Sequence, residues 1–273
     1  MLRIETRHGW WLITHPDHAR LAGCFAREWG NERFRRPEPR ARVLHAIASH
    51  DDGWCERDAS PAITRDGRPS AFSTELVGSY SAFEEIDLEE YLAVRRRAVS
   101  AIATDDAYAA LLIATHTGNL LTSHVDRAAM TDEQLSILDR FLSEQSEFQQ
   151  TLRDAIQRDS TLADDEKHEE AIRENFRLLQ ACDNLSLLTC VAFDKPSSLL
   201  HPLALRDGGS APVDVLPLAP RHFRLTPWPF AEPELRFEFP ARHVTGKCFR
   251  SSESLAEAFH MASVETLLVR LSA

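Results

Sequence analysis

The chain has 273 residues, 43% of them apolar, and a formal net charge of −11. This length suffices for one large domain, or for one domain with a small appendage, and the charge disfavours nucleic acid and anionic membranes as partners. Because no apolar run is long enough to span a membrane and the N-terminus lacks a signal-peptide pattern, we expect a cytoplasmic protein.

The first third of the chain predicts a hairpin, two helices and a long loop. Gly9 lies between the β-prone runs LRIET and WWLIT, which favours a short hairpin. Pro16 is typical of a helix start, and a helix is predicted over 16–29. A second helix is predicted over 39–50. The loop over 51–86 is rich in aromatic residues, which argues for a functional loop and against a disordered one.

Helical periodicity then fills the middle of the chain. At least four pieces are predicted, over 88–102, 105–121, 132–158 and 164–193. The first of them contains the run Arg95-Arg96-Arg97, which is flanked by acidic residues. We interpret this run as a solvated helix face.

The composition changes after Pro196. The segment PSSLLHPLALRDGGSAPVDVLPLAP is rich in proline and reads as a linker or a wrapped connection. The runs RHFRLTP, ELRFEFP and ARHVTGKCF alternate and predict strands, followed by a short helix over 252–261 and a strand over 266–271.

We therefore expect a mainly α fold with a small antiparallel β-sheet. The helical domain is placed over 1–195 and includes the N-terminal hairpin. The region over 196–273 supplies the small sheet, which we expect to pack on the helices or to pair with the hairpin, because so short a sheet is marginal alone. Five cysteines without a CxxC pair are expected to be reduced thiols.

The stretch VLHAIASHDDGW, residues 43–54, is the first candidate for chemistry. His50 and Asp51 would point about 100° apart on a continuous helix, so they converge on one centre best where the helix ends. Gly53 supplies that ending. The alternative is a histidine that the dipole favours at a helix C-terminus, followed by polar loop residues.

Three further residues favour a metal site. His18 lies in the first helix, His116 lies late in another, and Asp183 lies in the apolar run LLQACDNLSLL. A buried aspartate is costly unless it is paired, hydrogen-bonded or bound to metal. Histidines and aspartates from four helices suit Mn, Fe, Zn or Ni, or Mg when fewer imidazoles bind.

The order of these residues resembles a known superfamily. A first-helix histidine, a His-Asp pair at a helix end and a late aspartate are similar to the HD-domain metal-dependent phosphohydrolases, over about residues 15–190. The sequence motifs HARLAG, HDDGW, GRPSAF and CDNLSLL resemble those of the DUF3891 family of uncharacterised bacterial proteins, and this resemblance covers nearly the whole chain. The resemblance implies an HD-like helical bundle.

The resemblance also implies a ligand set of His18, His50, Asp51 and Asp183 around one divalent ion. Asp51 could bridge to a second ion, which His116 and His124 would then bind. His15 and His45 fit the pattern less well, and we expect them to be capping or packing histidines. One ion or two are both compatible with the sequence.

In this reading the protein hydrolyses a phosphoester or a related small molecule with metal-activated water. Asp51 would orient that water, and Asp52 or His116 would transfer protons. The loop would contribute the substrate contacts, from Trp54, Arg57, Arg68 and Phe72. The two aromatic residues could instead fill the gap between loop and bundle.

Two other functions are compatible with the sequence. No phosphate-binding signature accompanies the histidines and aspartates, so the substrate could be less charged, as in di-iron oxygenases of the HD fold. A helical ligand-binding or interaction module with a degenerate, metal-free site is the non-enzymatic alternative. The partner we expect is a small molecule, and a homo-oligomer is compatible with the sequence.

Overall fold

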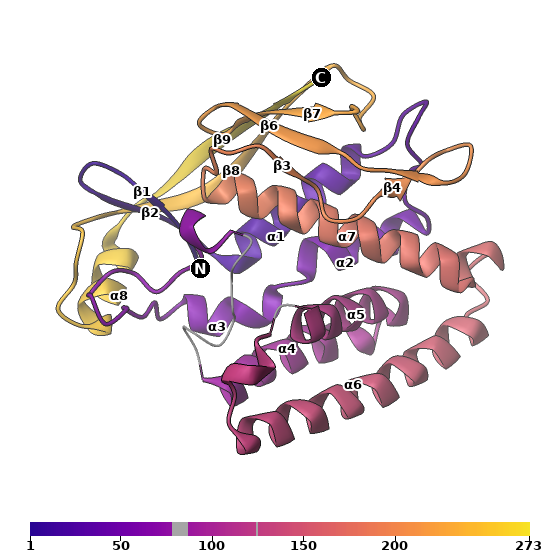
Figure 1. Ribbon diagram of the computed structural model, residues 1–273, viewed down its shortest axis with the longest axis horizontal. Coiled ribbons are helices and arrows are strands. Elements are labelled where there is room, and N and C mark those ends of the chain that lie inside the picture. The colour runs from indigo at the N-terminus through magenta and orange to yellow at the C-terminus, as the bar shows by residue number, and fades with distance from the viewer. Residues whose placement is uncertain (78–86, 124) are drawn as a thin grey trace.

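A computed structural model of the chain describes residues 1–77, 87–123 and 125–273 (Figure 1). The fold is mixed α/β, so the prediction of a mainly α protein is wrong. A seven-stranded sheet has the order β1-β2-β8-β9-β7-β6-β3. It is mixed and not purely antiparallel, because β7 and β9 run parallel.

The N-terminal hairpin forms one edge of this sheet. It consists of β1 (Leu2–Glu5) and β2 (Gly9–Ile13), and β2 pairs with the far end of β8 (Glu234–Thr245). Gly9 is needed there, because a Cβ atom at this position would lie 1.9 Å from the carbonyl oxygen of Val244. The two ends of the chain are thus joined in one sheet.

The C-terminal region supplies the other strands. They are β3 (Ser197–Ser198), β6 (Asp214–Ala219), β7 (His222–Thr226) and β9 (Val264–Ser272), and a separate pair is formed by β4 (Leu203–Ala204) and β5 (Ser210–Ala211). Four of these short strands lie in the proline-rich segment that was predicted to be a linker. The two predicted strands on either side of Pro240 form one strand, β8. Proline has no N–H to donate to a neighbouring strand, but none is needed here, because β2 pairs only with residues 242–245 of β8.

The helices match the predicted pieces closely, except for α3, which lies in the predicted loop. They are α1 (His15–Glu28), α2 (Arg40–Ser49), α3 (Cys55–Asp58), α4 (Leu88–Ala103), α5 (Ala107–Ser123), α6 (Asp132–Arg158), α7 (Glu169–Cys190) and α8 (Ser252–Met261). Helix α1 packs against β8, α2 and α7, and α5 packs against α2, α4, α6 and α7. In Figure 1, α1 and α7 lie under the sheet and α6 lies farthest from it. One apolar core includes residues of these helices and of the sheet.

Two further expectations concern the chain as a whole. All five cysteines are free, as expected. Among the described residues, no helix combines the length and the apolar character that crossing a membrane requires.

Candidate metal centre

Helix α1 brings His18 into the core. Thr14 caps the helix, because its hydroxyl accepts a hydrogen bond from the backbone N–H of Asp17, and Pro16 occupies the first turn. His18 therefore lies one turn inside the helix. It shares the buried face with Leu21 and Phe25, and its side chain is fully buried.

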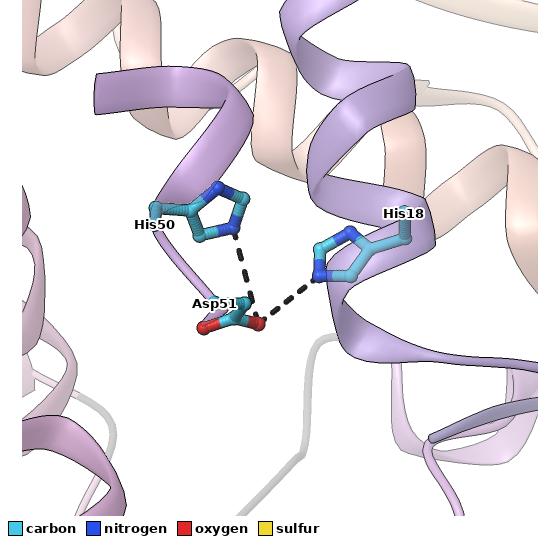
Figure 2. Close-up of side chains that lie close together, drawn as sticks. All are labelled: His18, His50 and Asp51. Carbon is cyan, nitrogen blue, oxygen red and sulfur yellow. Dashed lines mark hydrogen bonds and ion pairs between the residues drawn. The ribbon is translucent and has the colours of Figure 1, made fainter. Parts of the chain in front are cut away.

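Where α2 ends, the side chains of His50 and Asp51 point toward the same centre. His50 is the C-cap of α2 and keeps a helical backbone, whereas Asp51 leaves the helix with φ −117° and ψ 17°. Both side chains are buried. Figure 2 shows them turned toward His18, where the Oδ2 atom of Asp51 lies 3.0 Å from His18 Nε2 and 3.9 Å from His50 Nε2.

Helices α5 and α7 complete the cluster with His116 and Asp183. Asp183 Oδ1 lies 3.2 Å from His50 Nε2, and Asp183 Oδ2 lies 3.8 Å from His116 Nε2. The side chains form two triads, His18–His50–Asp51 and His50–His116–Asp183. Within each triad the potential ligand atoms lie within 4.8 Å of one another, so these buried triads could hold a metal ion.

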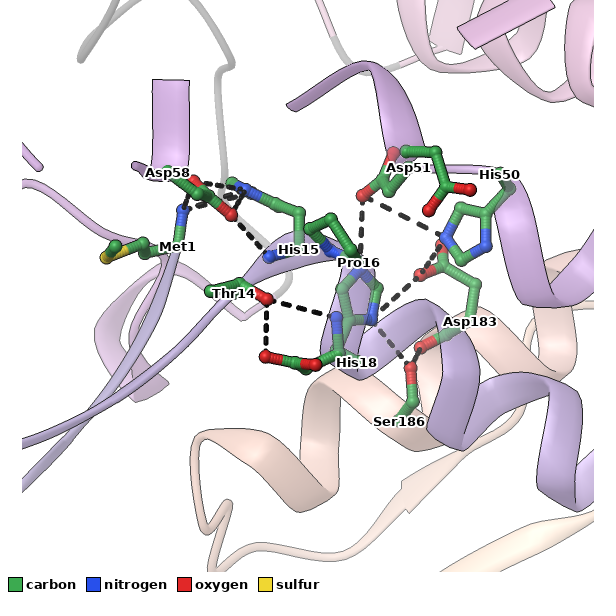
Figure 3. A network of polar contacts seen from close by, with 12 residues as sticks. Met1, Thr14, His15, Pro16, His18, His50, Asp51, Asp58, Asp183 and Ser186 are labelled. Atoms are coloured by element: carbon green, nitrogen blue, oxygen red, sulfur yellow. Dashed lines mark hydrogen bonds and ion pairs between the residues drawn. The ribbon is translucent and has the colours of Figure 1, made fainter. Parts of the chain in front are cut away.

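Protein acceptors fix the orientation of two of the imidazoles. The Ser186 hydroxyl donates to the carbonyl oxygen of Asp183 at 2.8 Å, so its oxygen accepts from His18 Nδ1–H, also at 2.8 Å (Figure 3). His50 Nδ1–H donates to the carbonyl oxygen of Ile47 at 2.8 Å. In both histidines the proton therefore lies on Nδ1, and Nε2 faces the cluster.

This arrangement leaves both Nε2 atoms facing carboxylate oxygens. A neutral imidazole would direct a lone pair at those oxygens, and two lone pairs repel each other. A cation bound to both Nε2 atoms would remove this repulsion, and a proton on His50 Nε2 removes it at that residue. Metal-ligating histidines in proteins commonly show this pattern, with the other ring N–H donated to a protein acceptor.

Arg95 is the member of the cluster that sequence analysis missed. Its side chain is buried and donates to Asp51 Oδ1 at 2.6 Å and to the Tyr91 hydroxyl at 3.0 Å, so the interpretation as a solvated face is wrong for this residue. Arg96 and Arg97 are exposed, as expected. The signal was present in the sequence: the apolar residues at three, four and seven positions from Arg95 place it on the buried face of α4.

Opposite charges control the titration of the cluster. Burial alone would lower the pKa of His50, but the carboxylates of Asp51 and Asp183 raise it to about 9. Against the effect of burial, Arg95 and His50 hold the pKa of Asp51 well below its usual range, and His50 lowers the pKa of Asp183. The metal-free cluster thus contains two carboxylates beside a protonated His50 and a guanidinium.

His116 differs from the other two histidines. Burial lowers its pKa to about 3, so the imidazole is neutral at physiological pH. Its Nδ1 atom has no hydrogen-bond partner among the described residues. His116 is therefore the cluster histidine whose tautomer no described residue fixes, and its proton can lie on either ring nitrogen.

The histidines outside the pattern have structural contacts. His15 lies beside the cluster in Figure 3, where its ring lies 3.1 Å from the Asp58 carboxylate, and it also stacks on Trp54 with ring centroids 4.4 Å apart. Burial lowers the pKa of His15 to about 4. His45 is half exposed and lies 3.3 Å from Asp106. Neither belongs to a triad.

The remaining predicted site residues lie around the cluster or away from it. Asp52 forms an ion pair with Arg20 at 2.8 Å and belongs to neither triad. Trp54 is buried, with Arg95 over its ring at 5.5 Å. Of the others, Arg57 pairs with Glu90, Arg68 is exposed, Phe72 pairs with Leu2 through the backbone, and His124 lies outside the described residues.

A groove of about 510 Å³ runs along α1. It is lined by α1 residues including Pro16, Asp17 and Arg20, by Asp58, and by residues of β8 and α8. His18 and the other cluster residues do not line it. The Asp183 side chain, about 10% exposed, is the most accessible of the five side chains that make up the two triads.

The comparisons identify a family but no activity. A family model described as "Protein of unknown function (DUF3891)" matches residues 1–246. The chain has no significant match among curated proteins, nor among solved structures. The comparisons give no link to the HD-domain superfamily.

Proposed function

We propose that this chain, which belongs to the DUF3891 family of unknown function, is a metal-dependent hydrolase of the HD type. Its substrate in this proposal is a phosphoester or a related small molecule. The residues of the candidate metal centre are the basis of this proposal. The ordered set of His18, His50, Asp51 and Asp183, which resembles the HD pattern, supports the proposal.

The observation that carries the proposal is the orientation of two imidazoles. Ser186 and the Ile47 carbonyl hold the Nδ1 protons of His18 and His50, and both Nε2 atoms face carboxylate oxygens. A cation among these atoms would satisfy all of them at once. Three imidazoles and two carboxylates form a donor set that suits Mn, Fe, Ni or Zn.

Each residue of the cluster would have its own role in hydrolysis. A divalent cation supplies Lewis acidity, which makes water a nucleophile near neutral pH. Asp51, held by Arg95, would orient the attacking water through its Oδ2 atom. His116, whose imidazole is neutral, would move a proton to or from the substrate when the other four residues hold the ion.

The test combines metal analysis with a hydrolysis assay. We expect the purified protein to contain near-stoichiometric Mn, Fe, Ni or Zn and to hydrolyse bis-p-nitrophenyl phosphate or p-nitrophenyl phosphate. A chelator should abolish the hydrolysis, and the same ion should restore it. If the protein holds no metal and binds none of these ions on addition, the hydrolase proposal fails and a metal-free binding module replaces it. If it binds metal but consumes oxygen and cleaves no phosphoester, an oxygenase replaces it.

Metal binding is expected to release protons. His50, with a pKa of about 9, is protonated at pH 7.5 and must lose its Nε2 proton to bind an ion. The apparent affinity for Zn²⁺ should therefore rise about tenfold per pH unit up to roughly pH 9 and then level off. Calorimetry in buffers of different ionisation enthalpy should show at least one proton released per ion.

The folding stability of the metal-free protein should change with pH in the opposite direction to the metal affinity. The protonated His50 stabilises the fold fully below its ordinary pKa of 6.5, and this contribution is lost as the pH rises through about 9.

His116 releases no proton when a metal ion binds, since it is already neutral. An ion that binds without proton release would show that His50 is not a ligand.

A further inference from the structure

We propose that the centre holds a single metal ion and that Arg95 takes the place of a second one. This inference rests on the proposed function and settles the number of ions that the sequence left open. Arg95 contacts Asp51 at Oδ1, the carboxylate oxygen that does not face His18. In the two-ion arrangement that the sequence analysis considered, Asp51 bridges the ions, and a bidentate bridge would use both of its carboxylate oxygens.

Arg95 already occupies one of those oxygens. Its Nη1 atom donates to Asp51 Oδ1 at 2.6 Å, while Asp51 Oδ2 faces His18. A guanidinium does not lose its proton in proteins, so it cannot yield this oxygen by deprotonation. A second cation on Oδ1 would lie beside a fixed positive charge in a buried environment, where water screens the repulsion poorly.

The surroundings hold Arg95 in place. Its Nε atom donates to the Tyr91 hydroxyl at 3.0 Å, and its guanidinium carbon lies 5.0 Å from the centroid of the Tyr91 ring and 5.5 Å from that of Trp54. These contacts come from α4 itself and from the turn that follows Asp51. Arg95 is thus a built-in cation on the Asp51 oxygen that a second ion bridged by both oxygens would use.

The histidines limit the number of ions in the same way. His50 belongs to both triads, but its Nδ1 atom is bound to Ile47, and Nε2 has one lone pair to offer. If an ion binds His18, His50 and Asp51, only His116 and Asp183 of the second triad remain for another. The two triads share His50, so two ions could not both use its Nε2 atom.

The experiment counts ions in the whole chain. Equilibrium dialysis against Mn²⁺ followed by elemental analysis should give one ion per chain in the wild type, and electron paramagnetic resonance should show an isolated Mn²⁺. Arg95→Met removes the charge at similar size, and we expect it to take up a second ion that couples magnetically to the first. Arg95→Lys, which keeps a cation, and Arg96→Met, on the exposed face of α4, should each bind one.

The outcomes separate the two proposals. A wild-type chain that binds two coupled ions overturns the inference and leaves the hydrolase proposal in place. An Arg95→Met chain that folds and still binds one ion overturns the role of Arg95. If Arg95→Met does not fold, the spectrum and stoichiometry of the wild type decide between one ion and two. A wild type that binds no Mn²⁺, Zn²⁺, Fe²⁺ or Ni²⁺ overturns both proposals.

Discussion

Alanine in place of His50 or of Asp183 is expected to lower the affinity for Zn²⁺ or Mn²⁺ by at least about 100-fold. Loss of a residue that only hydrogen-bonds to a ligand already lowers metal affinity by up to about 100-fold, and loss of a ligand itself should cost at least as much. His50 contributes the Nε2 atom common to both triads, and Asp183 lies between His50 and His116. Each substitution therefore removes a donor that the other ligands cannot replace. Competition with a chromophoric chelator measures the affinity.

The matched control for these variants is His45→Ala. His45 lies on the same helix as His50, but it is half exposed and contacts Asp106 outside the cluster. It should keep the wild-type affinity. Circular dichroism should accompany each titration, because Asp183→Ala leaves a protonated His50 without its nearest carboxylate. Folded His50→Ala and Asp183→Ala chains that bind metal as tightly as the wild type would remove these residues from the ligand set.

Gly53→Ala is expected to destabilise the protein by about 2–3 kcal/mol, which corresponds to a decrease in melting temperature of roughly 5–10 °C. A Cβ atom at position 53 would lie 2.2 Å from the carbonyl oxygen of Val94 and 2.9 Å from the backbone nitrogen of Ala98. These atoms belong to the turn of α4 that carries Arg95. The glycine therefore lets α4 approach closely enough for Arg95 to reach Asp51.

Gly118→Ala is the control for this effect. Gly118 lies inside α5, and among the described residues a Cβ atom there would meet only the Gln149 side chain, at an ordinary 3.6 Å. Alanine is the better helix former, so this change should stabilise the protein by about 0.5–1 kcal/mol. Thermal unfolding of both variants tests the contrast. Equal melting temperatures for Gly53→Ala and the wild type would show that α4 can move away without cost.

The helices were predictable because their signals are local. Helix α6 has the predicted bounds, and its start is fixed by a capping box in which Thr131 and Gln134 bond reciprocally. The end of α2 at His50 was also readable from Gly53 and the apolar run before it. Residue spacing along one helix decides such features, and the sequence contains that spacing directly.

The members of the candidate site were also readable, though not all of them. The cost of burying Asp183 among apolar residues pointed to a partner, and the structure provides His50 and His116. Arg95 was missed because an arginine beside acids on a helix is usually solvated. Its burial depends on the close approach of α4 to Asp51, which is a contact between distant parts of the chain.

The sequence by itself therefore determined the longer helices, the ends of several of them and the order of histidines and aspartates. Only the tertiary structure decided the sheet and the charge balance of the site. Strand β2 pairs with β8 more than two hundred residues away, and β6 lies in a proline-rich segment whose local signals favour a linker. Strand pairing and the neutralisation of a buried charge both depend on partners that are distant along the chain, and local propensity does not record them.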